Sequence, residues 1–573
     1  MSETLISFKN FSWKYKSQAE PTLRGLSFDV HKGEKILICG PSGCGKSTVA
    51  HCINGLIPFS YPGDITGSLV LCGRETKELS IFDISKMVGT VLQDSDGQFV
   101  GLTVAEDIAF ALENDCVPQT DLIRTVKETA EEVFISDHLK HAPNELSGGQ
   151  KQRVSLAGVM VDKVPILLFD EPLANLDPAT GKKSIALIDD IQKKTGATVI
   201  IIEHRLEDVL YKHVDRIILM SEGTIVSDTT PDRLLSTDLL ARYGIREPLY
   251  LTALKYAGVA ITPDMKPDML DSMILSESDI RKVKDWFETN THAGEEKRED
   301  RQLSVSHVRF TYDNGYKALD DLNFDINKGE MVSIVGTNGA GKSTLAKVIC
   351  GFLRQQEGSV ISHDDGVDTD FAGLSIKEIS DHVGYVMQNP NQMISKVMIA
   401  DEVGLGLETR GVDPETIQKK VEETLKVCGL YPFRKWPVSA LSFGQKKRVT
   451  IASILSLDPE VIILDEPTAG QDYRHYTDIM EFLRELNGQG VTVIMITHDM
   501  HLMLEYCGRA IVVTDGKIFA DTTPAAVLTD TELVRKASLK ETSLYNLAVR
   551  CGIEDARGFT QHFIDYERGL RQR

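Results

Sequence analysis

The stretch GPSGCGKST at residues 40–48 returns in slightly altered form as GTNGAGKST at residues 336–344. Each copy follows a short apolar run, at 35–39 and at 331–335, and each has the spacing GxxxxGK[ST] of a phosphate-binding loop. Glycines in such a loop let backbone N–H groups converge on phosphate oxygens, and the helix that follows directs its positive end at them. Two copies, each after a strand-like run, predict two nucleotide-binding domains.

These loops contain the first group of expected ATP-binding residues. Lys46 and Lys342 would reach the β- and γ-phosphates, and Ser47 and Ser343 would ligate Mg²⁺. The complete set is Gly40, Ser42, Gly43, Gly45, Lys46, Ser47 and Thr48, and Gly336, Asn338, Gly339, Gly341, Lys342, Ser343 and Thr344.

The rest of the chain repeats at nearly the same offset. LSGGQ at 146–150 returns as LSFGQ at 441–445, FDEP at 169–172 as LDEP at 464–467, and DTTP at 228–231 as DTTP at 521–524. This indicates a tandem duplication of a large unit. The predicted divisions are a first domain, its C-terminal extension, a linker, a second domain and its extension, at 1–230, 231–260, 261–302, 303–523 and 524–573.

Short β-branched and apolar runs, such as 166–169 and 198–202, alternate with helical stretches, which predicts an α/β fold with a mostly parallel sheet in each domain. We also expect a helical subdomain in each domain. The end of the linker, at 291–302, is charged and nearly free of apolar residues, and apolar residues before it suit a short packed helix.

Composition excludes several classes of function. The 573 residues carry a net charge of −21, which argues against binding to nucleic acid. No apolar run approaches the roughly 18–20 residues that cross a bilayer, so we expect no direct membrane insertion. The nine cysteines include no CxxC pair, which favours reduced thiols over a metal site.

An acidic pair ends one apolar strand in each half. Asp170 and Asp465 would hold Mg²⁺ through its water shell, and Glu171 and Glu466 would polarise the attacking water. In isolation such a pair suits a solvated turn, but downstream of a phosphate loop it predicts the second half of a nucleotide site.

The LSGGQ element, followed by an Arg-containing helix and the Asp-Glu strand, resembles the ATP-binding cassette (ABC) ATPases, and the resemblance covers nearly the whole chain twice. It implies roles for eight further residues. Tyr15 and Tyr312 match the aromatic that stacks on adenine, and Gln93 and Gln388 match the glutamine that contacts Mg²⁺ and senses the γ-phosphate. Asp177 and Asp472 match the loop that crosses to the partner cassette, and His204 and His498 match the switch histidine.

The resemblance also implies a head-to-tail pairing of the two cassettes, in which ATP binding closes the pair and hydrolysis reopens it. Signature residues Ser442, Gly444 and Gln445 would complete the site built around Lys46 and Glu171, here called site one. Ser147, Gly149 and Gln150 would complete the site around Lys342 and Glu466, called site two. Phe443 replaces the first signature glycine, but the residues expected at phosphate are kept, so we expect both sites to hydrolyse ATP.

The segment after Gln93, with DSDGQF and then TVAEDIAFALEN at 103–114, looks like the ATPase subunits of energy-coupling factor (ECF) transporters, which import vitamins and some metal ions. That family implies a membrane scaffold (T-type) protein, a small substrate-binding (S-type) membrane protein and a position on the cytoplasmic face of the cell membrane. Glu106, Asp107, Asp401 and Glu402 are the expected scaffold contacts, although a solvated helix start explains them about equally well. Thiamine or its hydroxymethylpyrimidine precursor is the favoured cargo by analogy, with cobalt or nickel as an alternative.

Two other readings stay open. A twin ATPase of a sugar importer also carries two cassettes, but such chains are typically shorter between cassettes and have one degraded site. An ABC-F-type translation factor usually has a basic linker and DEPTNHLD, whereas this chain has DEPLANLD and DEPTAGQD, and region 228–302 holds 15 acidic against 11 basic residues.

Overall fold

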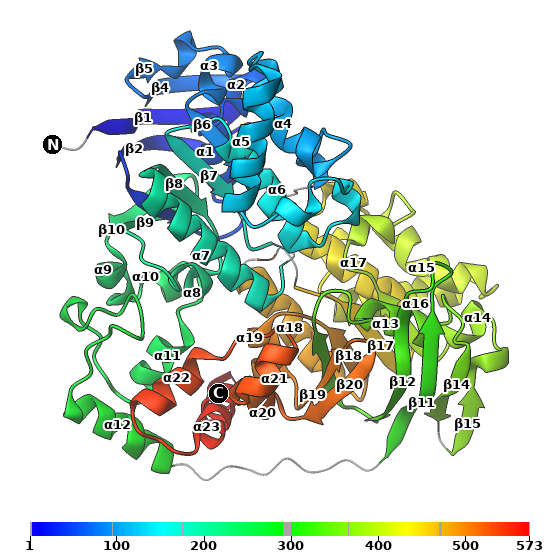
Figure 1. Cartoon of the computed structure of the whole chain (residues 1–573). Helices are drawn as coiled ribbons and strands as arrows, with labels where there is room; N and C mark the ends of the chain where they lie inside the picture. Colours follow the sequence, from blue (N-terminus) through cyan, green and yellow to red (C-terminus); the bar gives the residue numbers. More distant parts are fainter. Residues whose placement is uncertain are drawn as a thin grey trace. The chain divides into compact units, whose positions relative to one another are not determined.

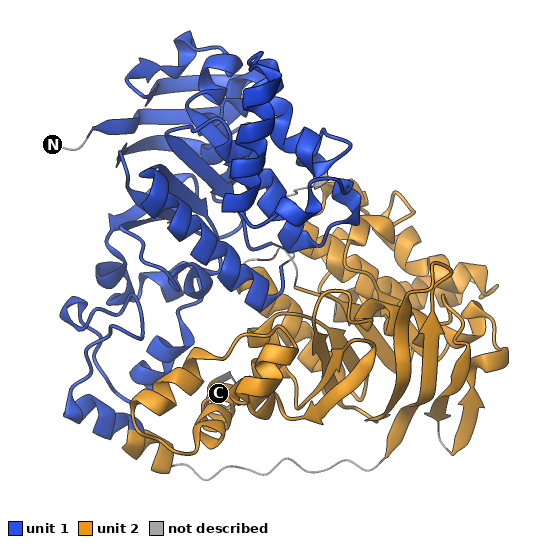
Figure 2. Cartoon of the chain, in the orientation of Figure 1, with its two compact units in different colours: residues 1–283 blue, residues 284–573 orange. Residues whose placement is uncertain are grey.

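The computed structural model of the chain describes residues 3–93, 96–174, 176–289, 300–364, 366–468, 471 and 473–571. The chain divides into two compact units, residues 1–283 and residues 284–573 (Figure 2). The division falls within helix α12 (Glu277–Glu288), inside the segment 261–302 for which the sequence predicts a linker.

The central sheet of unit 1 has the strand order β10-β9-β3-β8-β7-β6 (Figure 1). All neighbouring strands are parallel except β10, which pairs antiparallel with β9 at one edge. Every residue of β3, β7 and β8 is buried, because helices cover both faces of a parallel sheet. The bounds are β3 Lys35–Cys39, β6 Val88–Val91, β7 Ile166–Asp170, β8 Thr198–Ile202, β9 Arg216–Ser221 and β10 Thr224–Thr229.

A second, antiparallel sheet of unit 1 has the order β2-β1-β4-β5 and shares its core with the phosphate-loop side of the central sheet. Its strands are β1 Thr4–Tyr15, β2 Leu23–His31, β4 Gly63–Leu71 and β5 Arg74–Glu75. The helices are α1 Lys46–Ile53, α2 Leu56–Phe59, α3 Ile81–Ser85, α4 Val104–Asn114, α5 Gln119–Glu132, α6 Gly148–Met160, α7 Pro178–Thr195, α8 Leu206–Val209, α9 Pro231–Leu235, α10 Leu239–Arg242 and α11 Leu249–Tyr256.

Unit 2 repeats this architecture, with a central sheet in the order β16-β17-β18-β13-β19-β20 and an antiparallel sheet in the order β12-β11-β14-β15. The strands are β11 Arg301–Thr311, β12 Lys317–Asn327, β13 Met331–Gly336, β14 Glu357–Asp364, β15 Val367–Asp370, β16 Val383–Val386, β17 Val461–Asp465, β18 Thr492–Ile496, β19 Arg509–Thr514 and β20 Lys517–Thr522. The predicted tandem α/β fold is therefore confirmed.

The helices of unit 2 follow the same order along the chain and end in a longer extension. They are α13 Lys342–Ile349, α14 Ile376–Ile379, α15 Ile399–Thr409, α16 Pro414–Val427, α17 Phe443–Leu455, α18 Tyr473–Gly488, α19 Met500–Tyr506, α20 Pro524–Thr529, α21 Thr531–Lys536, α22 Ser543–Arg550 and α23 Ala556–Arg571. The indole of Trp286, from α12, packs edge-on against Phe559, His562 and Tyr566 of α23 in this extension. Across the described ranges, no helix has the length and apolar character needed to cross a membrane.

Local sequence explains where the helices next to the predicted sites begin. Gly45 precedes α1 at φ 103°, a left-handed conformation that glycine adopts without strain. Ser147 and Ser442 cap α6 and α17, and each exchanges hydrogen bonds with the glutamine three residues later. Thr103 and Glu106 form the same kind of capping box at the start of α4.

Candidate nucleotide-binding sites

The two phosphate loops have the same internal geometry. Lys46 Nζ donates to the carbonyl oxygens of Gly40 and Pro41 at 2.8 and 2.9 Å, and Lys342 Nζ donates to those of Gly336 and Thr337 at 2.9 Å each. Both lysines are buried. Each ammonium group thus lies within the curve of its own loop. A bound phosphate would replace the loop carbonyls as the acceptor of its hydrogen bonds.

Glycine is required where each loop leaves its strand. Gly40 and Gly336 have φ of 158° and 147°, and a Cβ at either position would overlap the backbone carbonyl of Met220 or Val513 on the neighbouring strand. The loops therefore stay close to the sheet, and a bound anion would lie at the starts of α1 and α13.

The acidic strand ends lie beside the loops. Asp170 bonds the hydroxyl of Ser47, and burial raises the pKa of Asp170 to about 6. Its Oδ1 atom is buried without a hydrogen-bond partner. In unit 2, Asp465 bonds Ser343 in the same way and burial raises its pKa as well. In unit 1 the site thus offers a serine hydroxyl and a buried carboxylate oxygen that has no hydrogen-bond partner. Oxygen ligands of this kind fit Mg²⁺.

The glutamate that follows each aspartate faces the histidine that is predicted to act as the switch. His498 Nδ1 lies 2.7 Å from Glu466 Oε1. In unit 1, His204 Nδ1 lies 3.9 Å from Glu171 Oε1 but only 3.1 Å from Glu203 Oε1. Burial raises the pKa of Glu171, and Gln93 Nε2 donates to Glu171 Oε2 at 2.5 Å. Each unit thus brings together its predicted glutamate and histidine from two neighbouring strands.

The predicted adenine-stacking tyrosines also lie near their loops. The hydroxyls of Tyr15 and Tyr312 are hydrogen-bonded to Thr48 and Thr344 at 3.3 and 3.0 Å. Asp177 caps α7 by accepting from the backbone of Thr180 at 2.9 Å. Asp472 lies outside the described residues.

The four acidic residues expected to contact a scaffold have local structural partners in three cases. Glu106 accepts from the backbone of Leu102 and Thr103, and Asp107 accepts from Val100 and Gly101. Glu402 is buried and accepts from the backbone of Ser395 and Lys396. Asp401 is exposed. These carboxylates shape the loops before α4 and α15, and the loops expose large apolar side chains, namely Val100, Leu102 and Val397.

The structure adds four residues that the sequence reasoning missed. Tyr385 donates its hydroxyl to Asp465 Oδ2 at 2.9 Å, and the buried Lys447 donates to the carbonyls of Met387 and Gln388 at 2.8 Å each. Glu203 and Arg205 flank His204. An alignment of the two repeats could have pointed to these four residues, because each one aligns with a different residue type in the other repeat. The counterparts of Tyr385, Lys447, Glu203 and Arg205 are Thr90, Gln152, Thr497 and Asp499.

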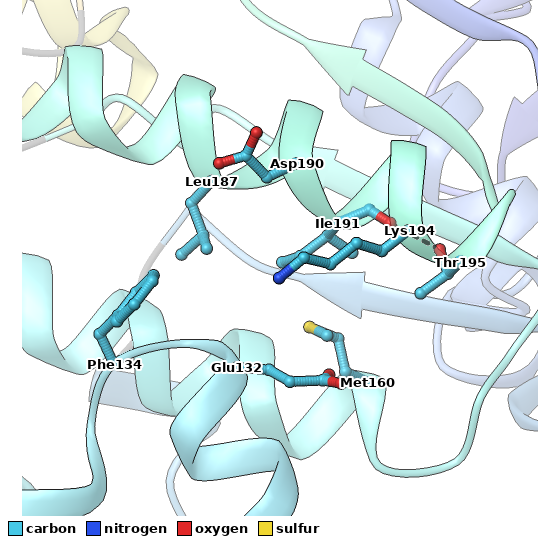
Figure 3. Close-up of a pocket in the computed structure, with 8 residues that line it drawn as sticks. All are labelled: Glu132, Phe134, Met160, Leu187, Asp190, Ile191, Lys194 and Thr195. Atoms are coloured by element: carbon cyan, nitrogen blue, oxygen red, sulfur yellow. Dashed lines mark hydrogen bonds between the residues drawn. The ribbon is translucent and has the colours of Figure 1, made fainter.

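A separate pocket of unit 1 lies between the end of α5, α6 and α7 (Figure 3). It includes none of the predicted nucleotide residues. Its lining is Glu132, Phe134, Met160, Leu187, Asp190, Ile191, Lys194 and Thr195.

Comparison with known families gives two matches. A family model described as "ABC transporter" matches residues 23–174 and 319–469. A second, described as "ATP-binding cassette cobalt transporter", matches residues 237–310, which include the whole of the predicted linker.

Curated relatives match over nearly their whole length. An ABC transporter ATP-binding protein of Clostridium perfringens is 58% identical over 569 residues, 99% of both chains. One from Enterococcus faecalis is 57% identical over 572 residues, 100% of both chains. Among solved structures, cbiO1 of Clostridium perfringens, part of the complex cbiONQ, is 34% identical and covers 42% of this chain and 94% of its own, with a TM-score of 0.38.

Proposed function

This chain belongs to the ATP-binding proteins of ABC transporters and is an ATPase, and from this premise we propose that it powers an ECF-type importer of a vitamin or related micronutrient. The observation that carries the proposal is the match of residues 237–310 to the family described as a cobalt transporter. This segment lies outside the two stretches that match the ABC transporter family model, so it distinguishes this chain from ABC ATPases in general. The sequence after Gln93 supports the same class.

The residues at the strand ends account for the chemistry in each unit. Lys46 and the backbone N–H groups of its loop would bind the β- and γ-phosphates, and Ser47 and Asp170 would hold Mg²⁺. Bound Mg²⁺ would supply charge neutralisation at the phosphate oxygens. Glu171 would orient the attacking water and accept its proton, a role that suits a carboxylate whose pKa burial raises.

His204 and Gln93 would complete the site from opposite sides of Glu171. Gln93 donates to one oxygen of this carboxylate and His204 lies near the other. In unit 2, Lys342, Ser343, Asp465, Glu466, His498 and Gln388 would take the same roles. Ser442 and Gly444 would complete site one, and Ser147 and Gly149 would complete site two, when the cassettes close on ATP.

We place the scaffold contact on the loops that follow Gln93 and Gln388. Val100, Leu102 and Val397 are 63%, 82% and 73% exposed, which is high for apolar side chains and typical of a partner surface. The exposed carboxylates Glu106 and Asp401 lie beside them and would attract basic residues of the scaffold. This would hold the chain at the cytoplasmic face of the membrane. The cargo would be selected by the S-type protein; thiamine or its hydroxymethylpyrimidine precursor is favoured by analogy, and cobalt or nickel fits the description of the matched segment.

Capture of the full chain from gently solubilised native membranes tests this proposal. Co-purification of two different small membrane proteins, lost when Leu102 and Val397 are both replaced by Asp, is the expected result. A single dimeric permease would instead indicate a sugar importer. Ribosomal proteins without membrane proteins would indicate a translation factor, and either result would overturn the proposal.

A further inference from the structure

The loops that carry the two switch histidines have different neighbours. Unit 1 has Glu203-His204-Arg205, and unit 2 has Thr497-His498-Asp499. Both loops follow a buried central strand, β8 or β18, so the difference lies within otherwise equivalent surroundings.

Glu203 ties the switch loop of unit 1 to the loop that follows Glu171. Its side chain is 0% exposed. Oε1 accepts from the backbone N–H groups of His204 and Arg205 at 2.9 and 3.1 Å, and Oε2 accepts from that of Leu173 at 3.3 Å. Charge-assisted bonds of this kind are stronger than neutral ones, and a buried carboxylate is costly to leave without them.

Arg205 closes the same connection from the other side. Its guanidinium donates to the carbonyl oxygen of Leu173. Leu173 is therefore held at its N–H by Glu203 and at its C=O by Arg205. Because Leu173 lies two residues after Glu171, this pair, here called the Glu203–Arg205 clamp, fixes the spacing between the catalytic glutamate's loop and His204.

Unit 2 uses the equivalent positions differently. The Thr497 hydroxyl lies 3.5 Å from Glu466 Oε2 and accepts from the backbone of Asp499. Asp499 caps α19 by accepting from His501 and Leu502. In the described part of unit 2, no hydrogen bond joins Thr497 or Asp499 to Thr468, the counterpart of Leu173.

We propose that the Glu203–Arg205 clamp is a positioning device for His204 that operates in unit 1 alone, so that site one is pre-organised for hydrolysis by a contact that site two lacks. The physical basis is that holding catalytic groups in place before the reaction removes part of the entropic cost of the chemical step. This inference rests on the proposed roles of Glu171 and His204. It goes further by making the two sites unequal and naming the residues responsible.

The test isolates site one with Glu466→Gln and then gives unit 1 the residues of unit 2, Glu203→Thr with Arg205→Asp. The kcat for ATP at site one should fall by about tenfold while KM changes less than about twofold, because nucleotide contacts are untouched. The milder single changes Glu203→Gln and Arg205→Lys should give intermediate losses and the same KM. The Arg205 side chain is 29% exposed, so its replacement should disturb the core less than replacement of the buried Glu203.

The matched control places the same double exchange in the Glu171→Gln background, where only site two turns over. The kcat of site two should stay within about twofold. An unchanged kcat at site one, or equal losses at both sites together with a lower melting temperature, would overturn the proposal. Residual hydrolysis in Glu171→Gln with Glu466→Gln would instead refute the catalytic assignment, so the two failures are distinguishable.

Discussion

Unit 1 and unit 2 keep the same phosphate-loop geometry but surround their acidic strand ends with different side chains. In unit 1, Gln152 bonds the carbonyl of Pro172 and the hydroxyl of Ser184. In unit 2 the same helix position is Lys447, which bonds the carbonyls of Met387 and Gln388. The duplication has thus preserved the groups expected to touch ATP, while the neighbours that position those groups have diverged.

The difference extends to the aspartates that are proposed to hold Mg²⁺. Tyr385 donates a hydrogen bond to Asp465 in unit 2. In unit 1 the counterpart of Tyr385 is Thr90, and its buried hydroxyl has no hydrogen-bond partner. The buried Oδ1 atom of Asp170 also has no hydrogen-bond partner. The two sites contain the same groups expected to react, but different side chains position those groups. The sites can therefore differ in the rate of ATP hydrolysis even if neither has lost an essential residue.

The largest expected effect comes from removing the two carboxylates that we propose to be catalytic. Glu171→Gln and Glu466→Gln, made separately, should each abolish hydrolysis at one site and remove a substantial part of total turnover, and the double variant should lose at least about 100-fold. Steady-state phosphate release measures this. If one single change left turnover intact, that unit would already be silent and the comparison of two working sites would fail.

Lys447→Gln would give unit 2 the residue of unit 1. Burial lowers the pKa of Lys447 to about 8, and the side chain still donates to two carbonyls at the start of the Gln388 loop. The shorter amide of glutamine cannot donate to both carbonyls. Turnover at site two should therefore fall about five- to tenfold, measured in the Glu171→Gln background. Lys446→Gln on the same helix is the control and should leave turnover unchanged. A loss as large in the control would show that the helix, rather than this contact, is responsible.

Glu460 should make the stability of unit 2 depend on pH in a way that unit 1 does not share, because unit 1 has Pro165 at the same position. Burial, with Asp364 nearby, raises the pKa of Glu460 to about 7. The folded state therefore holds this proton more tightly than the unfolded chain, and the group destabilises unit 2 increasingly as pH rises from about 4.5 to 7.

Glu460→Gln should accordingly stabilise unit 2 by about 1–3 kcal/mol at pH 8 and by much less at pH 5. Hydrogen exchange of peptides from β14 and β17 measures the unit separately. Glu423→Gln, at an exposed position of α16, is the control and should show no such pH-dependent gain. An equal gain at both pH values would contradict the titration argument.

The smallest effect is expected at the altered signature. Phe443 is 43% exposed at the first position of α17, and the bonds between Ser442 and Gln445 that begin this helix are intact. Phe443→Gly should change turnover at site one by less than about twofold, measured in the Glu466→Gln background. A tenfold gain would show that the phenylalanine obstructs the site and that the units differ at the signature as well.

Most features that could be predicted from the sequence depend on short-range patterns of residues. The phosphate loops, the acidic pairs and the capping boxes of α6 and α17 each depend on residues within a few positions of one another, so spacing alone specifies their geometry. The ordered repetition of these patterns then predicted the tandem α/β fold and the family. The exposure of the four acids expected at a scaffold was harder to predict from sequence, because Glu402 has the sequence context of a surface acid but is buried against its own preceding loop.

The sequence by itself determined two nucleotide-binding units and the residue types expected at the phosphates. Only the tertiary structure decided which side chains support them. Tyr385 bonds Asp465 across 80 residues, Lys447 bonds Gln388 across 59, and Arg205 bonds Leu173 across 32. Such contacts follow from which strands and helices are neighbours, and no local spacing encodes them, because the sheet order places strands side by side that are far apart along the chain.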